Sequence, residues 1–209
     1  MSDLFYLQDS RSNVGSRAMF WRLGGGYTSN LDEAEEFTRD RAVRQYECRE
    51  TDLPWPVSYV RGLAKVGVDH QDLDLSREKA LSSAPAEDRI YVAYDRAWDG
   101  NCLIWMSLPA GKGSDLSVAR TWTLDHAAGF AARGYLPWPK SYIDQHARPV
   151  ALAAQLDHKQ AMRSVGLKLP KIIRPRIRRY TLNCNGCGRF LSERQRFFDC
   201  PNCGACNAP

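Results

Sequence analysis

The pattern of hydrophobic and polar positions near the start of the chain predicts two strands followed by two short helices. Runs rich in aromatic and β-branched residues, bounded by turn-forming residues, predict a hairpin, and apolar residues spaced by three predict a helix after a glycine turn. The expected elements are strands 4–8 and 18–23, a turn at 24–26, a short helix from Leu31 to Phe37, and a helix over 39–47. Thr38 can cap the last of these helices.

The same pattern returns in the second half of the chain, at an offset close to 85. The sequence Leu-Pro-Trp-Pro-x-Ser-Tyr at 53–59 recurs at 136–142. Further matches keep their order: Tyr6 with Tyr91, Trp21 with Trp105, Leu31 with Leu116, and Phe37 with Trp122. This order predicts an α+β fold built by tandem duplication, with one repeat at 1–65, a polar linker at 66–88 and a second repeat at 89–158. The repeated tryptophans are expected in the core: Trp21, Trp55, Trp105 and Trp138.

Composition and hydropathy are those of a soluble globular protein. The chain has 209 residues, a formal net charge of +5 and a mean hydropathy of −0.48. No apolar run approaches the roughly 18 residues of a membrane helix, and the first residues lack the features of a signal peptide. We therefore expect a cytoplasmic protein with no membrane partner.

Charge is distributed unevenly along the chain. Residues 1–158 carry 18 Lys and Arg against 22 Asp and Glu, whereas residues 159–209 carry 11 against two. A folded core gains nothing from separating its charges in this way. The basic C-terminal region therefore indicates contact with an anionic partner, either a nucleic acid or an acidic protein surface.

Five of the seven cysteines lie at the C-terminal end of the chain, between positions 184 and 206. Two Cys-x-x-Cys-Gly sequences, with twelve residues between Cys187 and Cys200, provide four thiolates that can surround one ion: Cys184, Cys187, Cys200 and Cys203. Two intervening residues let a tight turn aim both sulfurs at the same ion, and the glycine lets the chain turn away. Cys206 also forms a Cys-x-x-Cys pair with Cys203, so it is an alternative ligand.

The segment that holds these cysteines, 180–209, resembles a zinc ribbon. Four sulfurs close the coordination shell and leave no position for water, so the expected ion is a single structural Zn²⁺. Metal ligation would supply most of the folding free energy of so short a segment. Iron in a rubredoxin-like site is the alternative occupant.

The preceding stretch, 159–179, is expected to be a basic arm. It has eight basic residues and no acidic one, and Pro170 and Pro175 exclude a continuous helix. In an extended chain, alternate arginines would lie on one face and could contact successive phosphates. The expected contact residues in the arm and the ribbon are Lys168, Lys171, Arg174, Arg176, Arg178, Arg179, Arg189, Arg194 and Arg196.

Three phenylalanines lie close to the cysteines in sequence: Phe190, Phe197 and Phe198. Large aromatic side chains are usually buried, so we expect them to pack around the metal. Base stacking is the alternative role.

No catalytic arrangement is predicted. The four histidines show neither His-Glu-x-x-His spacing nor a Gly-x-Ser-x-Gly neighbourhood. The stretch 110–114 contains a Gly-Lys-Gly sequence, but Met106 stands where a phosphate loop needs its leading glycine. The chain is therefore expected to be a binding protein, with an enzyme of unknown class as the least favoured interpretation.

The repeated units, with Gly-Tyr-Thr-x-x-Leu-x-x-Ala-x-x-Phe-Thr at 26–38 leading to Leu-Pro-Trp-Pro-x-Ser-Tyr, resemble small accessory proteins of bacteriophages and mobile elements. This resemblance implies a bacterial host and a non-enzymatic role. The leading hypothesis is binding of a nucleic acid or a host protein complex through the basic arm and the zinc ribbon. The alternative is an inhibitor of a host defence system, such as an anti-CRISPR protein, acting by protein–protein contact.

Overall fold

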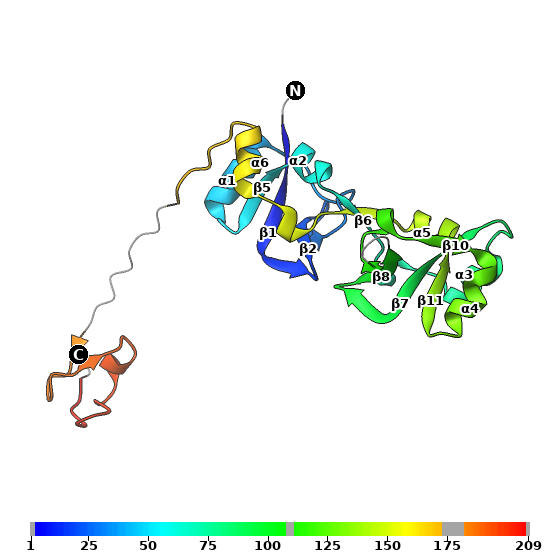
Figure 1. Ribbon diagram of the computed structural model, residues 1–209. Coiled ribbons are helices and arrows are strands. Elements are labelled where there is room, and N and C mark those ends of the chain that lie inside the picture. Colours follow the sequence, from blue (N-terminus) through cyan, green and yellow to red (C-terminus); the bar gives the residue numbers. More distant parts are fainter. Residues whose placement is uncertain (1–2, 108–110, 173–181, 208–209) are drawn as a thin grey trace. The chain divides into compact units, whose positions relative to one another are not determined.

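The chain divides into two compact units, Met1–Pro170 and Lys171–Pro209. The computed structural model describes residues 3–107, 111–172 and 182–207. Helices and strands are mixed along the chain, which confirms the α+β class (Figure 1). None of the helices in these described ranges is long and apolar enough to cross a membrane.

The first unit contains two five-stranded sheets, of which the first, here called the N-terminal sheet, is built around its longest strand, β1. Its order is β3-β2-β1-β4, and β5 also pairs with β1. The strands are β1 (Leu4–Val14), β2 (Arg17–Trp21), β3 (Tyr27–Thr28), β4 (Phe37–Thr38) and β5 (Asp52–Pro56). All of these pairings are antiparallel, so the predicted hairpin at the start of the chain is confirmed.

The second sheet has the same pattern of neighbours around β7. Its order is β10-β7-β8-β9, and β11 also pairs with β7. The strands are β7 (Arg89–Asp99), β8 (Cys102–Ser107), β9 (Gly111–Gly113), β10 (Thr121–Thr123) and β11 (Tyr135–Pro139). The two Pro-Trp-Pro strands lie in equivalent registers, because Trp55 is opposite Tyr6 and Trp138 is opposite Tyr91.

Strand register corrects one of the matches expected from the sequence. Gln8 pairs with Phe20 in the N-terminal sheet, and Ala93 pairs with Trp105 in the second sheet. Ala93 follows Gln8 by 85 positions, and Trp105 follows Phe20 by the same 85 positions. Trp105 therefore corresponds to Phe20, and both are fully buried. The counterpart of Trp21 is Met106. The sequence match between the two tryptophans was wrong by one position, and one position moves a side chain to the opposite face of a strand.

The helix that follows β4 forms as expected. It is α1 (Arg39–Cys48), and the Thr38 hydroxyl accepts a hydrogen bond from the backbone N–H of Arg41. In the second sheet the same place is taken by a 3-10 turn, η3 (Leu124–His126), and a short helix, α4 (Ala127–Ala131). Each Pro-Trp-Pro strand leads directly into one further short helix: α2 (Val57–Gly62) after β5 and α5 (Lys140–Gln145) after β11.

The short helix expected from Leu31 to Phe37 is absent from this described stretch. Ala34 forms a bridge with Arg22, and the backbone N–H of Glu35 donates to the carbonyl oxygen of Trp21 at 2.8 Å. Residues 31–33 form a turn, and the contacts of Ala34 and Glu35 with the end of β2 prevent the helix from continuing. The corresponding part of the second sheet contains only the 3-10 turn η2 (Leu116–Val118), capped by Asp115.

The segments that follow α2 and α5 exchange places between the two sheets. Strands β6 (Lys65–Gly67) and β12 (Arg148–Val150) pair with each other, after which α3 (Arg77–Ser83) packs on β11 and α6 (His158–Ser164) packs on β5. Figure 1 shows α6, in yellow, beside the blue and cyan elements of the N-terminal sheet. Two further 3-10 turns lie on these connections: η1 (His70–Asp72) and η4 (Ala153–Gln155).

This exchange gives residues 66–88 a structural role. Val68 and Ala80 belong to the core of the second sheet, and Ala151, Ala161 and Met162 belong to the core of the N-terminal sheet. The connection expected to be a linker therefore supplies buried side chains to the sheet that follows it. Each sheet is completed by the segment that leaves the other.

Two hairpin turns meet where the exchanged segments cross. Gly15 and Gly100 both have φ near +60°. A Cβ atom on Gly15 would lie 2.2 Å from the backbone nitrogen of Gly100, and one on Gly100 would lie 2.6 Å from the carbonyl carbon of Val14. Only glycine fits at both places. Close by, the buried Arg17 guanidinium donates to the Asp99 carbonyl oxygen at 2.6 Å.

Most of the repeated tryptophans lie in the core, as predicted. Trp55, Trp105 and Trp138 are buried, whereas Trp21 is only partly buried. Trp55 donates from Nε1 to Gln8 at 2.7 Å. Ala93 stands at the equivalent register in the second sheet, and the Trp138 nitrogen has no hydrogen-bond partner among the described residues. The aromatic frame is thus kept in both sheets, although its polar contacts differ.

The second unit is much smaller. Its described elements are β13 (Leu182–Asn183), β14 (Phe190–Leu191) and the 3-10 turn η5 (Gln195–Phe197). The two strands pair with Leu182 opposite Leu191. Among the described residues, the buried cluster consists of Leu191 and two cysteines, with Ala205 packed against them. Apolar burial on this scale does not stabilise an independent fold.

Candidate metal centre and basic surface

The first Cys-x-x-Cys-Gly sequence forms a tight turn between β13 and β14. The backbone N–H of Cys184 donates to the Arg189 carbonyl oxygen at 2.8 Å, and the N–H of Gly188 donates back to the Cys184 carbonyl oxygen at 2.8 Å. Gly188 has φ +70°, which favours glycine. The backbone N–H of Gly186 points at the Cys184 sulfur, 3.3 Å away. The turn therefore directs backbone donors toward a thiolate.

The second Cys-x-x-Cys-Gly sequence repeats this geometry. The backbone N–H of Cys200 donates to the Ala205 carbonyl oxygen, and the N–H of Gly204 donates to the Cys200 carbonyl oxygen, both at 2.8 Å. Gly204 has φ +72°. The two turns thus present two pairs of sulfurs in the same local conformation.

The structure brings the four predicted ligands together. The sulfurs of Cys184, Cys187, Cys200 and Cys203 all lie within 4.8 Å of one another. The Cys184 and Cys203 sulfurs are 3.5 Å apart, and those of Cys187 and Cys200 are 3.7 Å apart. Four thiolates at about 2.3 Å from a central Zn²⁺ in a tetrahedron are about 3.8 Å apart, so the cluster has the right size to hold a metal ion.

The electrostatics of the thiols also suit a cation. Backbone N–H groups of Cys187 and Gly186 lower the pKa of Cys184 from 9.0 to about 6. Although the backbone N–H of Ala205 lowers it, the pKa of Cys203 is raised to about 12 by hydrogen bonds with the sulfurs of Cys187 and Cys184. One thiol therefore ionises readily while its neighbour keeps a proton. A divalent cation at the centre would replace such shared protons, because metal binding requires thiolates.

A contact outside the four ligands was not predicted from the sequence. The Asn202 side chain lies with Nδ2 3.6 Å from the Cys187 sulfur, and its Oδ1 accepts a hydrogen bond from Arg189 at 3.1 Å. Groups that hydrogen-bond metal ligands orient them and tune their basicity. Asn202 stands between the two cysteines of the second turn, so its position in the motif was the available signal.

Cys206 lies outside the cluster formed by the described cysteines. It forms a bridge with Asp199 and is exposed. Its backbone therefore closes the base of the second turn while its thiol takes no part in the group of four. This placement favours the first of the two ligand sets that the sequence allowed.

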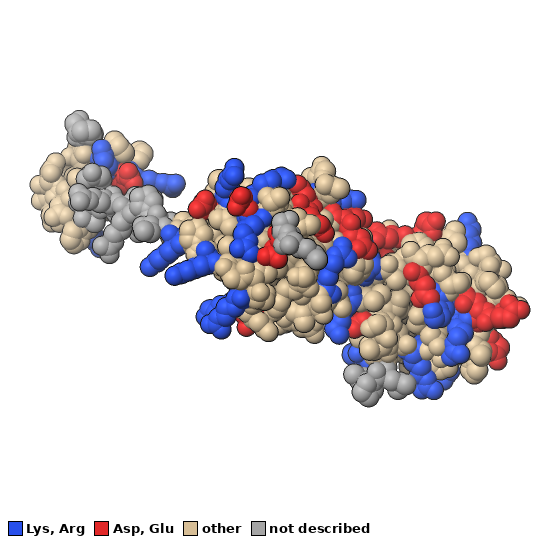
Figure 2. All heavy atoms as spheres, turned by 90° about the horizontal axis from the view of Figure 1, so that it is seen from above, with Lys and Arg blue, Asp and Glu red and all other residues tan. Residues whose placement is uncertain are grey.

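The predicted basic contact residues are spread over both units. Lys168 is exposed in the first unit, and Lys171, Arg189 and Arg194 are exposed in the second, where Arg196 is half-buried. The remaining predicted contacts, Arg174, Arg176, Arg178 and Arg179, lie outside the described residues. By sequence, the second unit carries eight basic residues against two acidic ones. On the face of the first unit in Figure 2, by contrast, both signs of charge are interspersed.

The expected packing of phenylalanines around the metal was wrong. Phe190, Phe197 and Phe198 are 73%, 54% and 70% exposed. In the two-residue strand β14, Leu191 points into the cluster, so the alternation of a strand turns Phe190 outward. The Arg196 guanidinium carbon lies 4.6 Å from the centre of the Phe197 ring. Exposed aromatic and basic side chains therefore share the surface of the second unit.

Comparison of the chain with models of known protein families, with curated proteins and with solved structures found no match.

Proposed function

We propose that this chain is a non-enzymatic nucleic-acid-binding protein of the cytoplasm, whose C-terminal unit is a zinc ribbon that holds the binding surface in place. The observation that carries the proposal is the coincidence, in one small unit, of a four-thiolate cluster with exposed arginines and exposed phenylalanines. Basic side chains neutralise phosphates, and exposed aromatic rings stack on bases.

The metal in this proposal is one structural Zn²⁺. A closed shell of four sulfurs supports a structural role, because no position remains for water or substrate. Zn²⁺ imposes no geometric preference through its d electrons, so it accepts the tetrahedral arrangement of four sulfurs. Metal analysis of the purified chain distinguishes it from iron. The buried apolar area of the unit is small, so metal binding would provide most of its folding free energy, on the order of 10 kcal/mol.

The first unit is proposed to be a tandem duplication that acts as a scaffold. The two sheets have the same strand order. In addition, paired residues of the first hairpin and the equivalent paired residues of the second hairpin are separated by the same number of positions in the sequence. The positions of α3 and α6 also support the duplication. Each of these helices follows one sheet in the chain and packs on the equivalent strand of the other sheet, α3 on β11 and α6 on β5. A duplicated scaffold can then change one copy without losing the fold.

Binding of labelled single-stranded DNA and RNA to the full chain, measured by fluorescence anisotropy as a function of salt, tests the proposal. Affinity should fall steeply between about 50 and 200 mM salt, because cations are released from the phosphates. Replacing Arg174, Arg176 and Arg178 by alanine should lower the slope of log K against log salt by about 2, since roughly 0.7 is lost per single-strand contact. The matched control replaces Arg44, Arg96 and Arg133 of the first unit.

The aromatic part is tested separately. Phe198→Leu keeps an apolar side chain but removes the ring, and it should weaken single-strand binding by about fivefold or more. Binding that is independent of salt and indifferent to both sets of changes contradicts the proposal. Recovery of a bacterial protein complex on the full chain after nuclease treatment, with no affinity for DNA or RNA, would instead support the hypothesis of a protein partner, on which the inhibitor hypothesis depends.

A further inference from the structure

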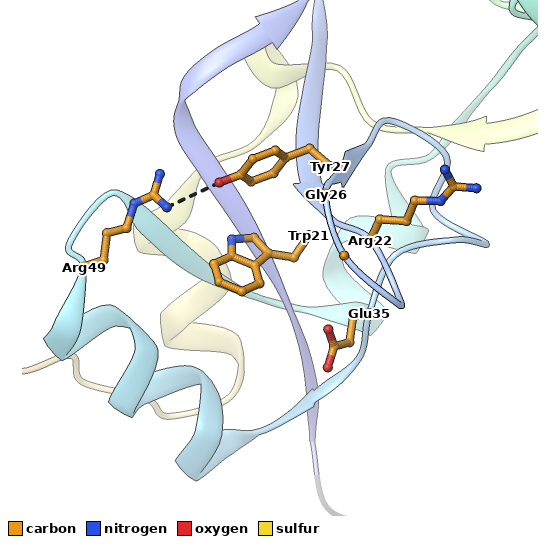
Figure 3. A pocket seen from close by; sticks show the side chains of 7 residues that line it. Trp21, Arg22, Gly26, Tyr27, Glu35 and Arg49 are labelled. Carbon is orange, nitrogen blue, oxygen red and sulfur yellow. Dashed lines mark hydrogen bonds between the residues drawn. The ribbon is translucent and has the colours of Figure 1, made fainter.

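A cavity of about 250 Å³ opens at the edge of the N-terminal sheet, away from the metal cluster in sequence. Its walls are two aromatic rings, Trp21 and Tyr27, and two charged side chains, Glu35 and Arg49 (Figure 3). Arg22 and the Gly25–Gly26 backbone form part of its rim, and the Arg22 guanidinium points away from the cavity toward Glu33, 3.0 Å away. The volume is below the ~300 to 1,000 Å³ typical of sites for drug-sized ligands, so it suits one ring system or one side chain.

The two rings are held in place by their neighbours. The Trp21 and Tyr27 centroids are 6.3 Å apart at 84°, and the other side of Trp21 meets Phe37 at 6.2 Å and 85°. Tyr27 is 41% exposed, so much of its ring faces solvent. A planar ligand in the cavity would therefore meet a fixed aromatic wall, which lowers the entropy lost on binding.

The Trp21 side chain, which lines the cavity, carries an unused hydrogen-bond donor. The Trp21 Nε1 atom is buried and has no hydrogen-bond partner among the described residues. Figure 3 shows this nitrogen on the edge of the indole that faces Tyr27 and Arg49. Trp105 and Trp138 also have buried nitrogens without partners in the described part of the chain, but both belong to the core of the second sheet. A buried donor without a partner is unfavourable, and a ligand acceptor would satisfy it.

Arg49 and Tyr27 add further donors that are fixed in position. Arg49 contacts the buried carboxylates of Asp9 and Asp52 at 3.5 and 3.4 Å, and it donates to the Tyr27 hydroxyl at 3.3 Å. Burial and the nearby carboxylates raise the pKa of Tyr27, so its hydroxyl keeps a proton to donate. The two carboxylates balance the charge of Arg49, which leaves donors in the cavity without a strong excess of positive charge.

Glu35 supplies an acceptor on another wall of the same cavity. The Glu35 side chain is half-buried, and its carboxylate makes a long contact of 3.4 Å with Arg41. A simple anion would satisfy the donors but be repelled by Glu35, and an ammonium group would face the Arg49 guanidinium. A neutral planar ring that carries both acceptors and N–H donors satisfies both walls. Nucleobases have that chemistry.

The second sheet shows that the fold does not require these residues. Tyr27 is opposite Trp21 in the N-terminal sheet, and at the same register Lys112 is opposite Met106. The hydrogen bond from Glu35 N to Trp21 O corresponds to that from Arg120 N to Met106 O, each at 2.8 Å. The framework pairs Tyr6 with Tyr91 and Trp55 with Trp138 are unchanged, so the cavity chemistry belongs to one sheet alone.

We propose that this cavity is a binding site for a single nucleobase, which would lie against Trp21 and Tyr27 and hydrogen-bond to the Trp21 nitrogen and the Glu35 carboxylate. The base can come from a free nucleotide or from a single-stranded nucleic acid. The site is formed entirely by the first unit, so it does not depend on the metal or on the basic arm.

Calorimetric titration of the full chain with the four nucleoside monophosphates, with ribose 5-phosphate as the abasic control, tests the site. Saturable binding of at least one monophosphate and none of ribose 5-phosphate is expected. Trp21→Phe keeps a ring and removes the N–H, and it should weaken binding by about fivefold, the equivalent of one hydrogen bond. Trp98→Phe alters an indole that is 51% exposed and does not line the cavity, so it should leave binding unchanged.

Glu35→Gln provides a second variant that leaves the core intact. It replaces an acceptor by a group that also donates, so it should change the order of preference among the four bases. A single-stranded trinucleotide identifies the source: equal affinity to the monophosphate indicates a free nucleotide, and a gain of about tenfold or more that Trp21→Phe abolishes indicates a base within a strand.

Three results would overturn the assignment. The first is the absence of saturable binding up to about 10 mM, a concentration at which even a very weak specific site would fill. The second is binding of ribose 5-phosphate with the same affinity as the monophosphates. The third is an equal loss of affinity in Trp21→Phe and Trp98→Phe. The variant with Arg174, Arg176 and Arg178 replaced by alanine should bind monophosphates normally. Failure of the ribbon as a nucleic-acid surface and failure of this cavity are therefore separate outcomes.

Discussion

The two units of this chain are stabilised by different means. The first unit buries large apolar side chains on two sheets, including Phe5, Phe20 and Trp105, all fully inaccessible to solvent. The second unit buries Leu191 and two cysteines among its described residues. Its backbone is organised by two turns that point four sulfurs at one place. A hydrophobic core needs many residues, whereas a metal centre needs four well-placed ligands, so a segment as short as Lys171–Pro209 can be ordered in the second way.

This contrast predicts that the units respond independently to perturbation. All six tryptophans precede residue 171, so tryptophan emission reports the first unit alone. Metal content, or the visible absorption of a cobalt(II) derivative, reports the second. The following changes are ordered from the largest expected effect to the smallest.

Removal of the metal, or Cys200→Ser, should unfold the second unit and leave the first unit folded. The loss is on the order of 10 kcal/mol of metal-coupled folding free energy. Metal analysis should show less than stoichiometric zinc or iron, while tryptophan emission stays unchanged. Cys48→Ser, which alters an exposed thiol of the first unit, is the control. A shift of tryptophan emission on chelation would contradict the independence of the units.

Trp105→Ala should destabilise the first unit by about 3–5 kcal/mol, because a fully buried indole leaves a large void. The midpoint of urea unfolding, followed by tryptophan emission, measures this change. Trp98→Ala, at a half-exposed indole, should cost less than about 0.5 kcal/mol. Metal content should be the same in both variants, and a loss of metal in Trp105→Ala would show that the units are coupled.

Gly100→Ala should lower the free energy of unfolding of the first unit by about 2–4 kcal/mol, because a methyl group there combines the strain of positive φ with overlap against the Val14 backbone. Gly134→Ala separates the two causes, because Gly134 has φ +81° but no atom within 4 Å of the added carbon. It should cost only about 1–2 kcal/mol, the strain alone. Equal effects of the two changes on the urea midpoint would mean that the hairpin turns do not meet closely.

Acidification should destabilise the first unit modestly through His158. Burial lowers the pKa of His158 below 6.5, and its ring lies 4.9 Å from Trp55. Below about pH 6.5 the unfolded chain binds a proton that the folded chain resists, so stability falls as the pH is lowered. Unfolding midpoints at several pH values should show this slope in the native chain and a smaller one in His158→Gln. His126→Gln, at an exposed ring, should keep the slope.

Local patterns in the sequence were sufficient for several elements. The Thr38 cap and the helix after it formed as predicted, because both depend on neighbouring residues. The spacing of the cysteines within each Cys-x-x-Cys-Gly sequence was enough to predict its turn for the same reason, and the two matching turns predicted the cluster. Each Cys-x-x-Cys-Gly turn closes through its own backbone hydrogen bonds, and only the meeting of the two turns is non-local.

Patterns that depend on distant partners were less informative. The apolar spacing of Leu31, Ala34 and Phe37 favours a helix, but contacts of Ala34 and Glu35 with β2 prevent it from forming. The exposure of Phe198 could not be predicted, because hydrophobicity alone does not tell whether a small unit has room to bury a ring. The cavity beside Trp21 depends on side chains from β2, β3 and the end of α1 that no motif connects.

The amino-acid sequence by itself determined the α+β class, the hairpins, the capped helix and the four clustered cysteines. Each of these features depends mainly on residues that are close to one another in the sequence. Only the tertiary structure decided that α3 and α6 cross to the opposite sheet, that Gly15 meets Gly100, and that Trp21 borders an open cavity with its nitrogen unpaired among the described residues. These features arise from the packing of segments that are distant in the sequence, where the free energy depends on shape and on available partners rather than on local periodicity.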